Sequence, residues 1–322
     1  MKVLITGGAG CIGSDLAVAL LARGDAVTVI DNLSSGKIEH IAGLQNRSHF
    51  RFVEGDLLDP DCLREVVQNQ DIVYHLAANP DVKFTIGDAT DKDLKQNILA
   101  TYNVLESMRV HGVKKLAFAS TSAIYGLVEQ QPIPEDLAPR PVSLYGATKL
   151  GCESLISAFQ HLFDMQCWIF RFANIVGEKV RKTGRTVIAD FIYKLLDNPH
   201  RLEILGNGKQ AKSYLLSSEC VDAMLHVVSR SSAGMNIYNL GCADSTPVDR
   251  IAEMVVEAMG LHHVEFCYSG GEVGWLGDVP RFRLDVSALE NLGWKARYNS
   301  DQAVSQAIQA ILRTMPARAG VR

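Results

Sequence analysis

The segment TGGAGCIG at residues 6–13 constrains the fold of this chain more strongly than any other part of the sequence. It follows a short β-branched run, which predicts a strand, and it precedes residues 12–23, whose apolar spacing predicts a helix. In such a strand–loop–helix unit, Gly7 permits a tight turn, Gly10 lets the backbone approach a pyrophosphate, and Gly13 lets the helix pack closely on the strand. The helix N-terminus then offers N–H groups and a positive dipole to an anion. An ordinary turn is the alternative for a glycine-rich loop taken alone.

An acidic residue follows the loop at the distance that a dinucleotide site requires. The second predicted strand, residues 26–30, ends in Asp31, about 20 residues after the glycines. Asp31 can accept hydrogen bonds from both ribose hydroxyls of an adenosine, whereas a 2′-phosphate would meet a carboxylate and, in residues 32–35, no arginine. The sequence therefore favours NAD over NADP. Asp56, after the third predicted strand at 50–53, is placed to meet the adenine amino group, and a helix cap is the alternative.

Short β-branched runs alternate with amphipathic segments through the first half of the chain. The runs predicted as strands are 3–6, 26–30, 50–53, 71–75, 115–120 and 166–172. The segments predicted as helices between them are 12–23, 61–68, 92–111 and 145–163. Buried strands separated by helices predict an α/β fold with a Rossmann-type, doubly wound parallel sheet.

The pattern becomes less regular after Asn174, where a smaller C-terminal α/β domain is expected. Helices are predicted near 186–197, 219–229 and 247–260, and one further strand at 235–240. We expect residues 1–173, with a returning segment near 212–243, to form an NAD-binding domain. Residues 174–211 and 244–322 are expected to form the smaller, substrate-binding domain, packed against the first because no low-complexity linker separates them.

Composition excludes several classes of protein. With 47% hydrophobic and 21% charged residues among 322, the chain has the apolar content of a large core and not of a disordered protein. Its formal net charge of −4 gives no basic excess for nucleic acid or an anionic membrane. Apolar runs end well before the roughly 18 residues of a membrane span. The seven cysteines lack CxxC spacing, which predicts no metal site and, with no leader before the first strand, a cytoplasmic protein.

Two polar clusters predict proton-transfer chemistry when they are taken together. In YGATK, Tyr145 and Lys149 lie at i and i+4, on one face of the predicted helix. An ammonium on that face, with the positive nicotinamide ring, lowers the phenol pKa from its usual value near ~10 and makes the phenol a usable base. The hydroxyls of residues 120–122 follow a strand, at the edge where open α/β sheets bind ligands. Alone, the pair also fits a solvated helix face and the hydroxyls fit a turn.

Together these motifs resemble the extended short-chain dehydrogenase/reductase family. The resemblance rests on TGGAGCIG, the Asp31-Asn32 pair, HLAA at 75–78, STSAIYG at 120–126 and YGATK at 145–149. Within the family the chain is most similar to UDP-glucose 4-epimerases and related nucleotide-sugar epimerases, and the match continues through RFAN at 171–174, LGNGKQ at 205–210 and GDVP at 277–280. The resemblance implies bound NAD, a nucleotide-sugar substrate such as a UDP-hexose, and a homodimer that pairs segments 92–111 and 145–163.

The resemblance also implies roles for individual residues. Tyr145 is the base, Lys149 is its partner and binds the nicotinamide ribose, and Thr121 is the hydroxyl beside the substrate oxygen. The implied cofactor-binding positions are Gly7, Gly10, Cys11, Ile12, Gly13, Asp31, Asn32, Asp56, Leu57, Leu76, Ala77, Ala78, Asn97, Tyr145, Lys149 and Phe172. The implied substrate-binding positions are Lys83, Thr121, Ser122, Tyr145, Asn174, Lys212 and Phe282. Caps of strand or helix ends are the alternative for Asn97 and Asn174, and the bulk of Phe282 favours a hexose without an N-acetyl group.

The residues after the hydroxyl position select among the reactions of the family. Relatives that eliminate water carry Asp-Glu there, and decarboxylating relatives keep a Glu. This chain has Ser122 and Ala123, which do not readily exchange that proton. The expected chemistry is therefore oxidation of a sugar hydroxyl and re-reduction on the other face.

Two departures from the family bear on the substrate. Lys212 stands where Arg is common, and Val273 stands where close relatives carry a second Arg, the residue that binds a pyrophosphate through two parallel hydrogen bonds. Lys83, Arg281 and Arg283 are the other candidate cations.

Two other functions stay open. One is a dehydrogenase or reductase, or an epimerase of a different sugar-like alcohol, and a net dehydrogenase would consume external NAD. The other is an NAD-binding protein without activity, against which the complete set of Thr121, Tyr145 and Lys149 argues.

Overall fold

A parallel sheet forms the centre of the molecule. The computed structural model describes residues 1–80, 89–177, 179, 186–275 and 277–315. Within these residues, seven strands pair in the order β11-β6-β5-β4-β1-β2-β3, and every neighbouring pair is parallel. The strands are β1 (Lys2–Thr6), β2 (Ala26–Asp31), β3 (Phe50–Glu54), β4 (Ile72–His75), β5 (Lys115–Thr121), β6 (Gln166–Phe172) and β11 (Met235–Leu240). The predicted doubly wound α/β fold is confirmed.

Helices cover both faces of this sheet because side chains alternate along each strand. In β1, Val3 and Ile5 pack with α1 (Cys11–Ala22) and α7 (Ser217–Arg230). Leu4 between them packs on the opposite face, in a cluster with the three helices α2 (Pro60–Val67), α4 (Ala100–His111) and α5 (Leu144–Phe163). Short helical segments complete this part: η1 (Ile38–His40), η2 (Ala42–Leu44), α3 (Asp91–Asp93), the π-helical η3 (Leu94–Leu99) and η4 (Ser122–Ile124).

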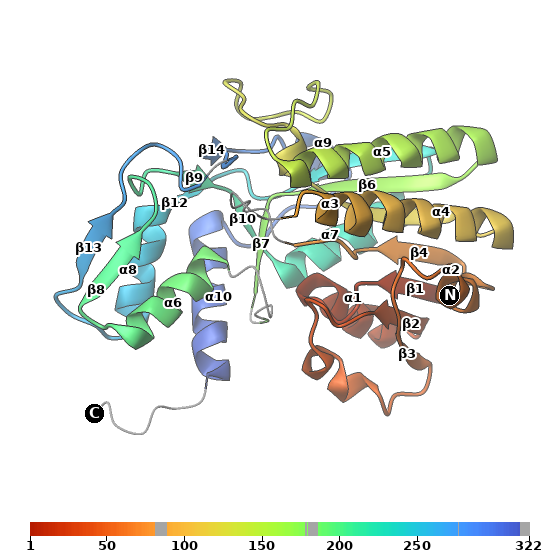
Figure 1. The fold of residues 1–322 in the computed structure, drawn as a ribbon, viewed down its shortest axis with the longest axis horizontal. Coiled ribbons are helices and arrows are strands. Elements are labelled where there is room, and N and C mark those ends of the chain that lie inside the picture. Colours follow the sequence, from red (N-terminus) through yellow and green to blue (C-terminus); the bar gives the residue numbers. More distant parts are fainter. Residues whose placement is uncertain (81–88, 178, 180–185, 276, 316–322) are drawn as a thin grey trace.

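A second group of elements lies beside the carboxyl ends of the sheet strands, on the left in Figure 1. Its helices are α6 (Val187–Asp197), α8 (Val248–Ala258) and α10 (Ser300–Thr314), which share one apolar cluster, while α9 (Ser287–Asn291) lies elsewhere. Its strands are β7 (Asn174–Val176), β8 (Arg201–Ile204), β9 (Ala211–Lys212), β10 (Tyr214–Leu216), β12 (Thr246–Pro247), β13 (Glu265–Tyr268) and β14 (Arg281–Phe282). They pair as β10-β7, β12-β9-β14 and β13-β8.

The reversal of strand order beside β1 places the functional region. Strands β2 and β3 extend the sheet from one edge of β1, and β4, β5 and β6 extend it from the other edge, so the strand order reverses between β1 and β4. Ligands of open α/β sheets bind outside the carboxyl ends of strands at such a point.

All seven cysteines carry free thiols. No helix among the described residues combines the length and hydropathy needed to cross a membrane.

Candidate active site

A cavity of about 1010 Å³ lies at the carboxyl ends of the central strands. Its walls come from the segments after β1, β2, β3, β4, β5 and β6, and from α5, α6 and the loop before β14. The predicted site residues on its wall are Gly7, Gly10, Cys11, Ile12, Gly13, Asp31, Asn32, Asp56, Leu57, Leu76, Ala77, Ala78, Thr121, Tyr145, Lys149, Phe172, Asn174 and Lys212. One cavity thus contains most of the residues that the sequence associates with cofactor and substrate.

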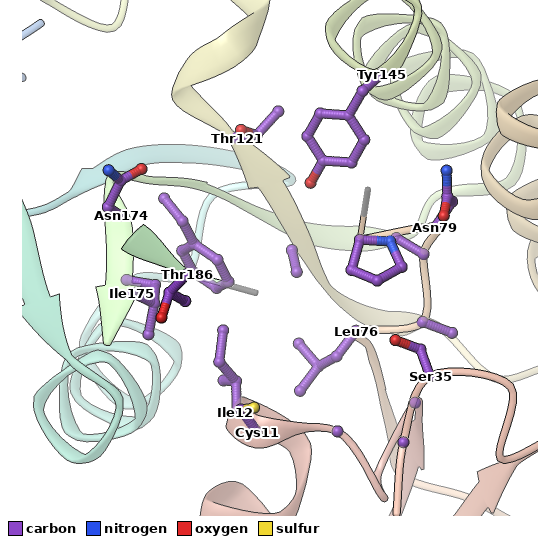
Figure 2. Close-up of a pocket in the computed structure, with 18 of the residues that line it drawn as sticks. Cys11, Ile12, Ser35, Leu76, Asn79, Thr121, Tyr145, Asn174, Ile175 and Thr186 are labelled. Atoms are coloured by element: carbon purple, nitrogen blue, oxygen red, sulfur yellow. The ribbon is translucent and has the colours of Figure 1, made fainter. Parts of the chain in front are cut away.

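The glycine loop forms one wall of the cavity, with Cys11 and Ile12 opposite Tyr145 in Figure 2. Gly7 has a φ of 69°, and a Cβ there would lie 2.7 Å from the Ala77 nitrogen. A Cβ on Gly13 would lie 2.4 Å from the Gly7 carbonyl oxygen. Both positions therefore need glycine, as the sequence predicts.

The start of α1 fits the diphosphate of a dinucleotide. Gly10 is the N-cap residue, so no side chain caps the helix, and the first turn carries no acidic residue. Backbone N–H groups and the helix dipole consequently meet the cavity without a competing carboxylate on that turn. NAD would lie with its diphosphate against this helix end and its adenosine ribose at Asp31.

The Asp31 carboxylate is held on the cavity wall by the backbone. Oδ2 accepts from the Ala9 N–H at 2.9 Å, and Oδ1 accepts from the Leu33 N–H at 2.8 Å. Among the described residues that line the cavity there is no arginine, so no guanidinium is available there for a 2′-phosphate. This arrangement favours NAD over NADP for the same reason that the sequence does.

Asp56 lies on the wall beside the second strand's end. Asn32 donates to its Oδ2 at 3.0 Å, and its Oδ1 accepts from the Leu58 N–H at 2.9 Å. The N-cap of α2 is Asp59, whose side chain accepts from the Asp61 N–H. The helix-cap alternative for Asp56 is therefore wrong.

The three proposed catalytic residues meet at the opposite wall. Thr121 ends β5, and Tyr145 and Lys149 lie in the first two turns of α5, which begins at the Ser143 N-cap. Figure 2 shows the Tyr145 hydroxyl pointing into the cavity beside Thr121. The Thr121 hydroxyl oxygen accepts from the Ala123 N–H at 3.2 Å, which leaves its hydroxyl hydrogen for a ligand oxygen.

Lys149 reaches the cavity from a buried position. Its side chain lies against Phe118, with Nζ 4.1 Å from the ring centroid. Burial lowers the Lys149 pKa to about 8, because a charged ammonium loses its hydration there. The amine is thus still protonated at neutral pH but close to its titration midpoint.

A buried hydrogen-bonded chain stabilises the strands beneath the site. His75 forms a 2.7 Å hydrogen bond to the Thr6 hydroxyl through Nδ1 and a 3.0 Å hydrogen bond to the Thr101 hydroxyl through Nε2. Burial, with a smaller contribution from Lys149, lowers the His75 pKa to about 3, so the imidazole is neutral. The motif HLAA predicts that residues 76–78 bind the cofactor, but it does not predict that His75 links β1, β4 and α4.

Four predicted residues do not lie on the described wall. Asn97 is buried in η3, where it accepts from the N–H of Asn79, a residue that does line the cavity, at 2.9 Å. Ser122 lies in η4 and is not a wall residue. Phe282 packs instead in a buried apolar cluster with Ile124 and its neighbours, because β14 turns its side chain into the core. Lys83 lies outside the described residues.

Lys212 is paired with a carboxylate that the sequence did not connect to it. Its Nζ lies 2.7 Å from Asp278 Oδ1 and 4.9 Å from the centroid of the Trp275 ring. The second Asp278 oxygen accepts from the Gly274 N–H at 3.0 Å. Val273, the second departure from the family, is exposed and does not line the cavity, whereas Trp275 and Asp278 do. The Lys212 ammonium is therefore part of an ion pair with Asp278.

The fold and the cavity define an α/β enzyme that uses a dinucleotide cofactor on an alcohol. The chain belongs to the NAD dependent epimerase/dehydratase family, whose model matches residues 3–241. The family resemblance and the NAD cofactor predicted from the sequence are thereby confirmed.

Several relatives that match nearly the whole chain are named as nucleotide-sugar 4-epimerases. A UDP-glucose 4-epimerase of Mycolicibacterium smegmatis is 29% identical over 313 residues, which cover 96% of this chain and 98% of the relative. The crystal structure of a UDP-galactose 4-epimerase is 34% identical, covers 97% of this chain and 99% of its own, and has a TM-score of 0.86. A UDP-glucuronic acid 4-epimerase from Bacillus cereus, in complex with UDP-glucuronic acid and NAD, is 27% identical over 98% of this chain and 100% of its own, with a TM-score of 0.88.

Proposed function

We propose that the protein is an NAD-dependent nucleotide-sugar 4-epimerase, of the type that interconverts UDP-glucose and UDP-galactose. The observation that carries the proposal is that Thr121 and Tyr145 face the glycine loop across the cavity, which Lys149, one helical turn after Tyr145, also lines. The names of the relatives support the 4-epimerase class. They differ in the sugar, so UDP-hexose as the substrate is our proposal and rests on the resemblance.

Each of the three residues has its own role in the proton transfer. Tyr145 takes the proton of the sugar 4-hydroxyl, since its own hydroxyl points into the cavity. The Lys149 ammonium favours the phenolate, and Thr121 donates to the reacting oxygen and keeps it in place. When NAD is bound, it supplies the acceptor and donor of the hydride at the same carbon. A turn of the 4-keto sugar between the two steps inverts the configuration, and Tyr145 returns the proton.

The segment after Thr121 does not supply a second acid or base. Ala123 has a methyl side chain, and its carbonyl oxygen packs so closely on α5 that a Cβ on Gly146 would lie 2.5 Å from it. Ser122 is not among the residues that line the cavity. This local structure supports epimerisation over loss of water or carbon dioxide.

The domain division and the homodimer are parts of the proposal. Residues 1–173 with 212–243 are assigned to cofactor binding, and residues 174–211 and 244–322 to the substrate. The seven-stranded sheet, which includes β11 from the second half, supports this division. Exposed apolar side chains on η3, α4 and α5 support pairing of two copies through these helices, among them Leu99, Tyr102 and Leu162.

The product is expected to be an epimer of unchanged mass, in reversible equilibrium with the substrate. Purified protein is incubated with UDP-glucose, UDP-galactose and other nucleotide sugars without added cofactor, and products are separated by chromatography and weighed by mass spectrometry. Re-reduction regenerates NAD, so turnover should continue without external NAD. A product lighter by water or carbon dioxide, or stoichiometric consumption of added NAD, would contradict the epimerase and favour the dehydratase or dehydrogenase alternatives.

Lys212 is expected to bind the substrate diphosphate, with Asp278 holding its ammonium at the cavity wall. Charge-assisted hydrogen bonds contribute roughly 1.5–3 kcal/mol, so Lys212→Met should weaken UDP binding about tenfold or more in calorimetry. Lys209→Met is the matched control, because Lys209 is an exposed lysine of the same segment, pairs with Asp249 and does not line the cavity. Unchanged UDP affinity in Lys212→Met would show that the diphosphate is bound elsewhere or that the substrate carries none.

A further inference from the structure

A buried ion pair joins the three elements that carry or adjoin the proposed catalytic residues. Glu153 of α5 accepts two hydrogen bonds from Arg171 of β6, from Nη2 to Oε2 at 2.8 Å and from Nε to Oε1 at 3.2 Å. The Ser120 hydroxyl of β5 donates to the same carboxylate. All three side chains are buried, and Ser120 directly precedes Thr121. The pair therefore ties the strand of Thr121 to the helix of Tyr145.

The Glu153 carboxylate also lies on the catalytic face of α5. Tyr145, Lys149 and Glu153 follow one another at intervals of four residues, so they line up along one side of the helix. Burial lowers the Lys149 pKa, and Cys152 and then Glu153 act in the opposite direction. Geometry and electrostatics thus connect Glu153 to the amine on which the proposed base depends.

We propose that Glu153 is a positioning residue for the reaction, one that fixes Thr121 relative to Tyr145 and places a carboxylate on the side of α5 that carries Lys149. The kinetic part of this inference rests on the proposed epimerase function. A buried ammonium needs a nearby anion to offset the loss of its hydration. Without the carboxylate, Lys149 and Arg171 would be two buried cations with no anion between them.

Besides Tyr145, whose phenolate forms in the reaction, Glu153 is the source of negative charge among the described groups that face Lys149. Cys152 and Glu153 lie on the same helix, His75 lies on β4, and Arg171 lies behind Glu153 on β6. His75 is neutral because its pKa is about 3. Cys152 raises the Lys149 pKa only as a thiolate, and because burial raises the pKa of its thiol, that thiolate forms only at higher pH.

The far side of Arg171 is anchored, which makes the pair rigid. Its Nη1 donates to the Tyr125 hydroxyl at 2.9 Å and to the Glu135 carbonyl at 2.6 Å. The Tyr125 hydroxyl in turn donates to Asn239 Oδ1 at 2.8 Å. Because the guanidinium is fixed on both sides, it holds the Glu153 carboxylate in one orientation.

The Lys149 amine can be followed without any substrate. In NAD-bound protein labelled with [ζ-¹⁵N]lysine, its Nζ resonance is assigned by its loss in Lys149→Met and titrated by NMR. The wild-type midpoint is expected below the usual lysine value, because burial lowers the Lys149 pKa. In Glu153→Gln it should fall by about one pH unit or more, because a close opposite charge shifts a pKa by about 1–3 units. Glu153→Asp keeps the charge and should return the midpoint towards the wild-type value.

Glu219→Gln is the matched control for this titration. Glu219 is another buried carboxylate, on α7, where it accepts from the Arg297 N–H and has no contact with the proposed catalytic residues. Its removal should leave the Lys149 midpoint unchanged. A wild-type midpoint in Glu153→Gln, or an equal shift in Glu219→Gln, would overturn the inference.

Kinetics separate positioning from a merely structural role. Glu153→Gln should lose about fivefold or more in kcat at the pH of the wild-type midpoint and less at lower pH, with KM little changed, since lowering a pKa by one unit cuts the protonated fraction there from one half to about one eleventh. If this variant does not fold, Ser120→Ala removes only the hydroxyl donor and should lower kcat without raising KM, and an unchanged kcat would overturn the positioning role. A wild-type protein that epimerises no nucleotide sugar contradicts the proposed function, while the NMR titration still decides the role of Glu153.

Discussion

Tyr145→Phe is expected to abolish turnover while the protein still folds and keeps its NAD. The substitution keeps the ring on α5 and removes the hydroxyl that points into the cavity beside Thr121. A general base contributes about 10²–10⁴-fold to a rate, so the residual activity should lie at least two orders of magnitude below wild type. The measurement is the initial rate of epimer formation together with the NAD released on denaturation.

Tyr268→Phe is the control for the loss of a phenol hydroxyl. Tyr268 is exposed on β13 and does not line the cavity, so its substitution should leave turnover unchanged. If Tyr145→Phe also turned over at nearly the wild-type rate, Tyr145 would have no part in the mechanism. If it lost NAD as well as activity, its role would be in cofactor binding.

Gly13→Ala is expected to give a protein without NAD and with a lower melting temperature. The added Cβ would lie 2.4 Å from the Gly7 carbonyl oxygen and 2.7 Å from the Gly8 Cα, and these backbone atoms cannot move aside as a flexible side chain can. Overpacking costs about 1–3 kcal/mol, and loss of a tightly bound ligand lowers stability further. NAD content is measured after denaturation, and stability by thermal unfolding.

Gly43→Ala is the control for replacing a glycine by alanine where the added methyl group meets no other atom. A Cβ on Gly43 would meet nothing within 4 Å, and Gly43 is not among the glycines with positive φ. This variant should keep its NAD and its melting temperature. Full NAD content in Gly13→Ala would show that the loop tolerates a shift of α1 and that its glycine is not required for the cofactor.

The cofactor half of the site could be predicted from sequence because its determinants are local. The turn at Gly7, the close packing at Gly13 and the position of Asp31 each depend on a strand and the few residues that follow it. The spacing of Tyr145 and Lys149 likewise fixes them on one helix face. These inferences need only the period of the element and not its tertiary partners.

The substrate half depends on contacts between distant residues, which local patterns do not encode. Lys212 and Asp278 are 66 positions apart and meet only because β9 pairs with β14. The same pairing turns Phe282 into the core and away from the predicted sugar contact. Strands of two to four residues, such as β9 and β8, are too short to show a period.

Helix α10 was missed although the sequence carries its start. Asn299 caps the helix and accepts from the Gln302 N–H, while the Gln302 side chain accepts from the Asn299 N–H. Apolar residues at helical spacing follow, among them Val304, Ile308 and Ile311. A capping box followed by this spacing predicts a helix, so the start of α10 is encoded locally in the sequence.

The position of β11 has a consequence for the order in which the protein can fold during synthesis. The sheet gains its edge strand beside β6 only when residues 235–240 have been made, and the face of α1 that carries Leu16 and Leu20 is covered by α7. A nascent chain that ends near residue 173 therefore exposes both an unpaired strand edge and an apolar helix face, two features that promote aggregation. The ribosome must add residues 174–240, a little under half of the chain that follows residue 173, before the nucleotide-binding sheet is protected, so the two parts of this protein mature together.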